Sequence, residues 1–172
     1  MVEHLLIHNM VQEAFLKSLL KITQSIYVPC IVSHLSRFMI NKVNGEIEIG
    51  NVRVSPSTTL SNFSKSTLGI SSKVLIKNND YVTLQVVTAS QIGLNLSFSN
   101  DRLSTVIIYL KSPESTWSSW SKNEEHEKKT KHDKILNADL GLEPYRFSWG
   151  EVESISDSKS GDSYVLVKYR TK

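Results

Sequence analysis

The chain has 172 residues, of which 20 are lysine or arginine and 17 are aspartate or glutamate, so its formal charge is +3. A length close to one domain and a hydrophobic fraction of 40% exclude a wholly disordered chain. The single cysteine, Cys30, excludes an internal disulfide and a zinc site built from four cysteines. A charge of +3 is too small to indicate nucleic-acid binding by itself.

The first part of the chain predicts one amphipathic helix. Apolar residues between positions 4 and 27 recur at steps of three and four, the spacing of a helical stripe. Glu3 stands where a signal peptide carries lysine or arginine, and Lys17 and Lys21 interrupt the apolar run before the ~20 residues of a membrane span. We expect residues 1–37 to form a helical extension and the protein to be cytoplasmic, without a membrane span.

From Phe38 onward the pattern alternates with a period of two, which predicts strands. Asn44-Gly45 predicts a two-residue type I′ hairpin turn. Two neighbouring strands should share one buried face, formed by Val82, Leu84, Val86, Leu94, Leu96 and Phe98. In the segment 103–110, the residues from Val106 onward are apolar at both odd and even positions, so both faces of this strand are apolar. This pattern predicts a central strand or one that is covered on its second face.

A dense charge run predicts a mostly solvated helix over 119–140. Three glutamates precede lysines by four residues, the favourable order for ion pairs on a helix: Glu124 with Lys128, Glu125 with Lys129, and Glu127 with Lys131. Gly141 suits the end of this helix. Residues 145–155 and 164–169 predict a last hairpin. The fold class is therefore α+β: a mainly antiparallel sheet of about seven strands, an N-terminal amphipathic helix, and a charged helix before the C-terminal hairpin. We expect residues 38–172 to be a single domain.

The motifs of common catalytic and metal sites are missing from the sequence. His126 and His132 lie six residues apart, so one helical face cannot hold both as metal ligands, and we interpret them as exposed. His4 and His8 are four apart but belong to an apolar stripe typical of packing. Neither a Gly-x-Ser-x-Gly motif nor a glycine-rich phosphate loop is present. We expect no enzyme, no catalytic residues, no metal site and no cofactor.

Charge patterns leave two further interpretations open. The lysines between residues 128 and 134 are nearly cancelled by acids, which makes nucleic acid an unlikely partner. From residue 143 to 162, five acids stand against Arg146 and Lys159, a local charge of −3. This segment is either a solvated hairpin, a surface for a basic partner, or an acid/base site if a histidine joins it.

The C-terminal half carries a recognisable order of motifs. It runs through Trp120, His132-Asp133, Leu136, Leu140-Gly141, Tyr145-x-Phe147-x-Trp149-Gly150-x-Val152, Asp157-x-x-x-Gly161 and Tyr164-Val-Leu-Val-Lys-Tyr169, preceded by Gly45-x-Ile47-x-Ile49 and Thr59-Leu60-x-x-Phe63. This order resembles a group of small uncharacterised bacterial proteins associated with contact-dependent and type VI polymorphic-toxin loci, where such proteins are immunity partners. The resemblance covers about residues 38–170.

The resemblance implies an immunity protein, a toxin inhibitor in bacterial competition that binds and neutralises a cognate toxin. It brings no catalytic residues. Many nuclease immunity proteins are acidic and this chain is +3, which leaves a lipase, a peptidoglycan-directed enzyme or another toxin open. The alternatives are a small enzyme, a nucleic-acid-binding module, or a structural or adaptor protein that uses its N-terminal helix. The sequence does not specify the toxin or the oligomeric state.

The expected partner-binding residues are one tryptophan and six acids that the fold does not need. They are Trp117, Glu124, Glu125, Glu127, Glu151, Glu153 and Asp157. Neutralising an exposed acid should change stability little, since exposed ion pairs contribute only ~0.2–1 kcal/mol. Trp120 and Trp149 are expected to pack inside the protein.

Overall fold

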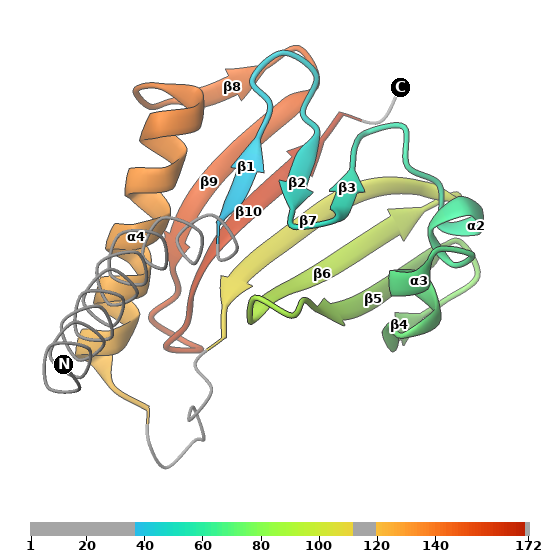
Figure 1. Ribbon diagram of the computed structural model, residues 1–172, viewed down its shortest axis with the longest axis horizontal. Coiled ribbons are helices and arrows are strands. Elements are labelled where there is room, and N and C mark those ends of the chain that lie inside the picture. The colour runs from blue at the N-terminus through green and yellow to red at the C-terminus, as the bar shows by residue number, and fades with distance from the viewer. Residues whose placement is uncertain (1–36, 112–119, 171–172) are drawn as a thin grey trace, which may run out of the picture. The chain divides into compact units, whose positions relative to one another are not determined.

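The computed structural model describes residues 37–111 and 120–170 (Figure 1). Its elements are β1 (Phe38–Ile40), β2 (Ile47–Ile49), β3 (Val52–Val54), α2 (Leu60–Phe63), α3 (Thr67–Ile70), β4 (Lys73–Lys77), β5 (Tyr81–Val87), β6 (Ile92–Ser99), β7 (Arg102–Leu110), α4 (Lys122–Leu140), β8 (Tyr145–Phe147), β9 (Gly150–Ser156) and β10 (Ser163–Tyr169). The helix expected within 4–27 and the side chain of Trp117 lie outside the described residues, and the domain boundary near residue 37 stays a prediction.

The described chain forms a large antiparallel sheet of seven strands and a smaller sheet of three. The large sheet has the order β4-β5-β6-β7-β10-β9-β8, and the small one has the order β1-β2-β3. In Figure 1 the small sheet and α4 lie over the same face of the large sheet. The expectation of one sheet was wrong for β1–β3: each is three residues long with both ends buried, and they pack as a second layer.

The register of the large sheet gathers its apolar side chains on the face under α4 and the small sheet. Leu84 stands opposite Leu96, and Leu94 opposite Ile108, so the predicted shared face is confirmed. Five of its six predicted members are buried and Val82 is half-buried. β7 pairs with both β6 and β10, which confirms the predicted central strand.

The loop between β1 and β2 is longer than a two-residue turn. It spans 41–46, and of Asn44 and Gly45 only Gly45 has a positive φ, 72°. The loop rests on two aromatic side chains of the large sheet region. Trp149 Nε1 donates to the Lys42 carbonyl at 3.0 Å, and the Tyr169 hydroxyl donates to the Gly45 carbonyl at 2.8 Å. In place of the predicted type I′ turn, the Asn41 amide donates to the Glu46 carbonyl at 2.8 Å and the Gly45 amide to the Asn41 carbonyl at 2.9 Å, and Gly45 packs against the ring of Trp149.

Helix α4 confirms the predicted charged helix and ends at Gly141, whose φ is 91°. The predicted Glu124–Lys128 pair is present at 3.2 Å. The predicted Glu125–Lys129 pair was wrong, because Lys129 bonds to Asp133 at 2.6 Å. Near the other end of the helix, Asp139 forms an ion pair with Arg37 and accepts from the Ile40 amide at 3.1 Å, which ties α4 to β1.

Two short capped helices lead the chain into β4. Thr59 caps α2 by accepting from the Asn62 amide at 3.1 Å. Ser66 caps α3 in the same way through the Gly69 amide at 3.1 Å. A Cβ at Gly69 would lie 2.0 Å from a backbone oxygen of Phe63, so only glycine permits this close turn.

Candidate binding surface

Exposed apolar side chains concentrate on one side of the described structure. Six of its ten exposed large hydrophobic residues belong to α3, β4 and β5: Ile70, Val74, Leu75, Ile76, Tyr81 and Val87. Ile70 is 77% exposed, close to full exposure for an isoleucine at a helix end. Gathered apolar exposure of this kind marks interaction surfaces, whereas scattered single residues do not.

Strand β4 is the edge of the large sheet, and all five of its residues are exposed. Val74, Leu75 and Ile76 are 53%, 41% and 49% exposed. The register passes from Val74↔Leu84 to Ile76↔Thr83, so Leu75 is an extra residue that forms a bulge. As a result Val74 points toward the core side of the sheet and Ile76 toward its open side, and the edge is apolar on both faces.

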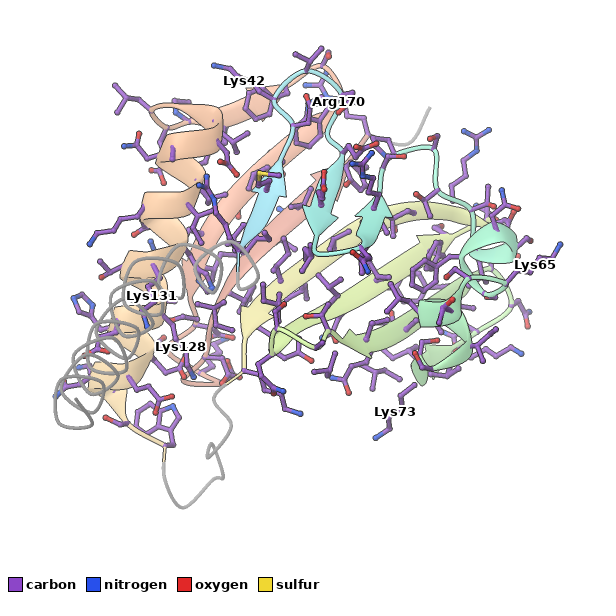
Figure 2. All side chains as sticks on the ribbon, viewed as in Figure 1. Lys42, Lys65, Lys73, Lys128, Lys131 and Arg170 are labelled. Atoms are coloured by element: carbon purple, nitrogen blue, oxygen red, sulfur yellow. The ribbon has the colours of Figure 1, made fainter. Side chains whose placement is uncertain are left out.

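The β4 edge, defined here as residues 73–77, is also basic. Lys73 and Lys77 flank the three aliphatic residues, and Lys65 lies between α2 and α3. Figure 2 shows Lys65 and Lys73 at this side of the protein. Among the described residues none of these three lysines is within ion-pair distance of a carboxylate, unlike Lys128, Lys129 and Lys168. The edge therefore combines apolar surface with uncompensated positive charge.

Glu125, expected on the partner-binding surface, is buried and fastens α4 to β10. Its carboxylate accepts from the Ser163 amide at 2.7 Å and from Lys128 Nζ at 2.6 Å. The Ser163 hydroxyl in turn donates to the Glu125 carbonyl at 2.8 Å. The expectation of exposure was wrong for this residue, because the helix needs its side chain to satisfy the first amide of β10.

Lys128 compensates the buried carboxylate. Burial alone would lower the Lys128 pKa, but its hydrogen bonds to Glu125 and Glu124 outweigh burial and the pKa is raised. Glu124 is half-buried and paired at 3.2 Å, whereas Glu127 is exposed. The three helix acids thus have three different environments, and of the three only Glu127 is exposed.

The acids of the C-terminal hairpin lie mostly on the open face of the sheet. Glu151 and Glu153 flank Lys168 at 3.1 and 3.6 Å, and the first of these contacts raises the Lys168 pKa. Asp157 is in the turn after β9, where the Lys159 amide donates to it at 2.8 Å and lowers its pKa. The structure therefore does not gather the predicted acids into one patch.

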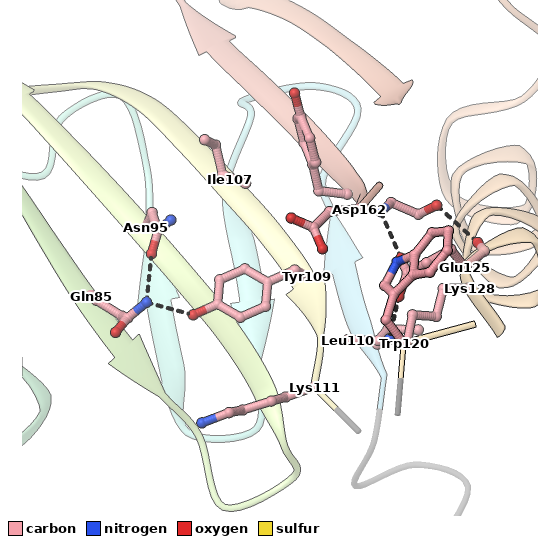
Figure 3. Close-up of a pocket in the computed structure, with 12 residues that line it drawn as sticks. Gln85, Asn95, Ile107, Tyr109, Leu110, Lys111, Trp120, Glu125, Lys128 and Asp162 are labelled. Carbon is pink, nitrogen blue, oxygen red and sulfur yellow. Dashed lines mark hydrogen bonds and ion pairs between the residues drawn. The ribbon is translucent and has the colours of Figure 1, made fainter. Parts of the chain in front are cut away.

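A hollow of about 490 Å³ lies beside the amino end of α4 and the open face of the sheet (Figure 3). Trp120 borders it, 46% exposed, and its Nε1 donates to the Gly161 carbonyl at 3.0 Å. The expectation that Trp120 packs inside was wrong, while Trp149 is buried as predicted. Tyr109 also lines the hollow; burial raises its pKa although Gln85 donates to its hydroxyl at 2.9 Å. The indole of Trp120 and the phenol of Tyr109 can stack with, or hydrogen-bond to, a side chain of a binding partner.

His132 is fully buried on the inward face of α4, which overturns its predicted exposure; His126 is exposed as predicted. Neither ring nitrogen of His132 has a hydrogen-bond partner among the described residues, and its ring centre lies 6.3 Å from that of Phe38. Burial lowers its pKa to about 4. The described residues contain no group of three or more His, Cys, Asp or Glu side chains placed to hold a metal.

The spacing of four residues within the charged segment could have predicted the buried face of α4. The buried residues Glu125, His132, Leu136 and Leu140 are separated by seven, four and four positions. These steps bring them to one face of a helix. The sequence contains no comparable signal for the exposure of β4, because a strand at a covered sheet edge and one at an exposed edge can have the same apolar residues.

Comparison with known proteins gives a distant similarity. Neither a family model nor a curated protein sequence matches the chain. A chain of the solved complex of Rhs1-CT with its cognate immunity protein RhsI1 is 13% identical to this one, with a TM-score of 0.49. The match covers 78% of this chain and 88% of that one. The score is too low for a functional conclusion.

Within the described residues, helices long and apolar enough for a membrane crossing are absent.

Proposed function

We propose that this protein is an immunity protein that binds a cognate bacterial toxin in the cytoplasm and neutralises it by covering its active site or substrate groove. The motif order within residues 38–170 supports the proposal through its resemblance to proteins of polymorphic-toxin loci. The toxin's chemistry is left open, because the chain is +3 whereas many immunity proteins against nucleases are acidic.

The exposed β4 edge is the observation that carries the proposal. Three consecutive aliphatic side chains are each more than two-fifths exposed at a sheet edge. Such an edge exposes unpaired backbone groups beside apolar surface, and its flanking lysines and its bulge leave the three aliphatic side chains exposed. A dedicated protein partner that covers it accounts for both features.

The position of His132 favours binding over catalysis. The enzyme alternative required the acidic hairpin to meet His126 or His132. His132 lies on the buried face of α4, on the core side of the sheet, whereas Glu151 and Glu153 alternate with the core-facing Val152 and point to the opposite side. Binding therefore has more support than catalysis as the mode of action.

Co-expression with a toxin tests the proposal. The toxin domain encoded next to this gene would be induced in a susceptible strain with and without the protein. We expect growth only when the protein is present, and a stable complex with an inactivated toxin domain in the nanomolar range of natural inhibitors, about 12 kcal/mol of binding free energy. Growth arrest despite full-length, folded protein would contradict the proposal, as would an isolated gene in a metabolic operon.

A further inference from the structure

We propose that β4 receives an extended segment of the toxin as an additional strand of the large sheet, and that this segment carries apolar residues flanked by acidic ones. The inference rests on the proposed function and deepens it by naming the surface and the partner's chemistry. It differs from the sequence-based expectation, which placed the partner on the acids of α4 and the C-terminal hairpin.

The backbone of β4 makes strand addition possible. In the described structure β4 pairs with β5 alone, at one end of the strand order. An edge strand directs every second residue's N–H and C=O away from the sheet, where a new strand can bond to them. Peptide recognition by strand addition obtains its affinity from these bonds and its specificity from the side chains beside them.

The charges on β4 define the flanks of the incoming strand. Lys73 and Lys77 stand at the two ends of the aliphatic run and lack carboxylate partners among the described residues. Between residues 60 and 91 the chain has three lysines and one acid, Asp80, so the local charge is +2. Acidic residues directly opposite lysines stabilise a strand pair, whereas like charges destabilise it.

The same lysines disfavour a second copy of this chain as the occupant. Two-fold antiparallel pairing of β4 about Leu75 would place Lys73 of each copy opposite Lys77 of the other. The bulge at Leu75 adds to this effect, because two-fold pairing would set the bulges of the two copies opposite each other. Lysine and bulge together guard against self-association and leave the apolar side chains free for a partner of opposite charge.

Two synthetic peptides test the inference on the full chain. Both have the same five-residue centre of alternating valine and threonine; one is flanked by glutamates and the other by lysines. We expect saturable backbone-amide NMR shifts at residues 73–77 and slower hydrogen exchange there with the glutamate peptide. The lysine peptide should bind at least about tenfold more weakly, and raising salt from about 50 mM to about 500 mM should weaken the glutamate peptide similarly.

Charge-reversed variants supply the matched comparison. Lys73→Glu combined with Lys77→Glu should reverse the preference between the peptides, whereas Lys159→Glu, an exposed lysine in the β9–β10 turn, should leave it unchanged. A thermal unfolding curve of each variant checks the fold. Equal binding of both peptides, shifts centred outside β4, or no saturation at millimolar peptide would overturn the inference. A stable dimer of the free chain that dissociates in the double variant would overturn it in favour of a second copy.

The two proposals fail in different ways. One outcome is that the protein and its double variant protect cells from the toxin equally well and that the glutamate peptide does not bind β4. In that case the strand-addition inference is wrong and the immunity function stands. If the glutamate peptide binds β4 as expected but the protein gives no protection, β4 serves another partner and the immunity function is wrong.

Discussion

At the scale of single residues, burial separates side chains that the sequence treats alike. Glu125 and Glu127 are two positions apart in the same charge run, yet one is buried between Lys128 and Ser163 and the other is solvated. Removing one partner of a buried pair leaves the other charge uncompensated, which costs far more than losing a surface pair.

We therefore expect Glu125→Gln to lower the free energy of unfolding by about 2 kcal/mol, because Lys128 loses its closest carboxylate. Glu127→Gln is the matched control and should change it by less than about 0.5 kcal/mol. Urea unfolding at neutral pH measures both. Equal stability of the two variants would mean that the buried pair does not fasten α4 to β10.

The burial of His132 should make the stability of the protein sensitive to acid. Its folded pKa of about 4 lies below its ordinary value of 6.5, so the unfolded chain binds more protons between these pH values. Stability should therefore be complete above pH 6.5 and fall as the pH drops toward 4, by about 3 kcal/mol for this residue. The neighbouring Asp133 opposes the pKa depression and Lys129 adds to it.

The variant His132→Leu isolates this contribution. It removes both unpartnered nitrogens, so we expect stability at pH 7 to be retained and the loss between pH 6.5 and 4 to become smaller than in the parent protein. Chemical unfolding at several pH values measures the difference. Parallel pH profiles for the two proteins would show that His132 is accessible to protons in the folded state.

At the scale of elements, the 41–46 loop depends on one glycine. Gly45 has a φ of 72°, and a Cβ there would lie 2.5 Å from the Trp149 ring. Gly50 has a similar φ of 57°, but such a Cβ there would have no neighbour within 4 Å in the described part of the chain. We expect Gly50→Ala to cost about 1 kcal/mol from backbone strain alone, and Gly45→Ala at least about 2 kcal/mol more, from the added clash. Thermal unfolding compares them; similar melting temperatures would mean that the loop moves away from Trp149.

The same elements show how far a sequence can be interpreted. The alternation of β5 and β6 predicts their shared face, because a one-residue slip would expose every apolar side chain. Helix α4 follows from its charge spacing and Gly141. The length of the β1–β2 loop, the exposure of Trp120 and the uncovered edge at Val74 do not follow, since each depends on which distant segment packs against it.

At the scale of the whole molecule, the register of the large sheet determines whether the chain folds. Leu96 is fully buried between Leu84 and Val106. An aspartate there would bury an unpaired charge, so we expect Leu96→Asp to prevent cooperative folding. Asn95→Asp, on the opposite face of the same strand, should fold and lose only a small part of the stability. Circular dichroism and thermal unfolding distinguish them, and a native melting transition for Leu96→Asp would contradict the register.

Hydrogen exchange of the protein, alone and bound to the inactivated toxin domain encoded beside its gene, tests the central claim most directly. The account predicts slower exchange on binding at the amides of β4, residues 73–77, and unchanged exchange along α4, residues 122–140. Protection confined to α4 or the C-terminal hairpin would move the binding surface to the predicted acids. Unchanged exchange everywhere, at a toxin concentration well above that of the protein, would contradict the immunity function itself.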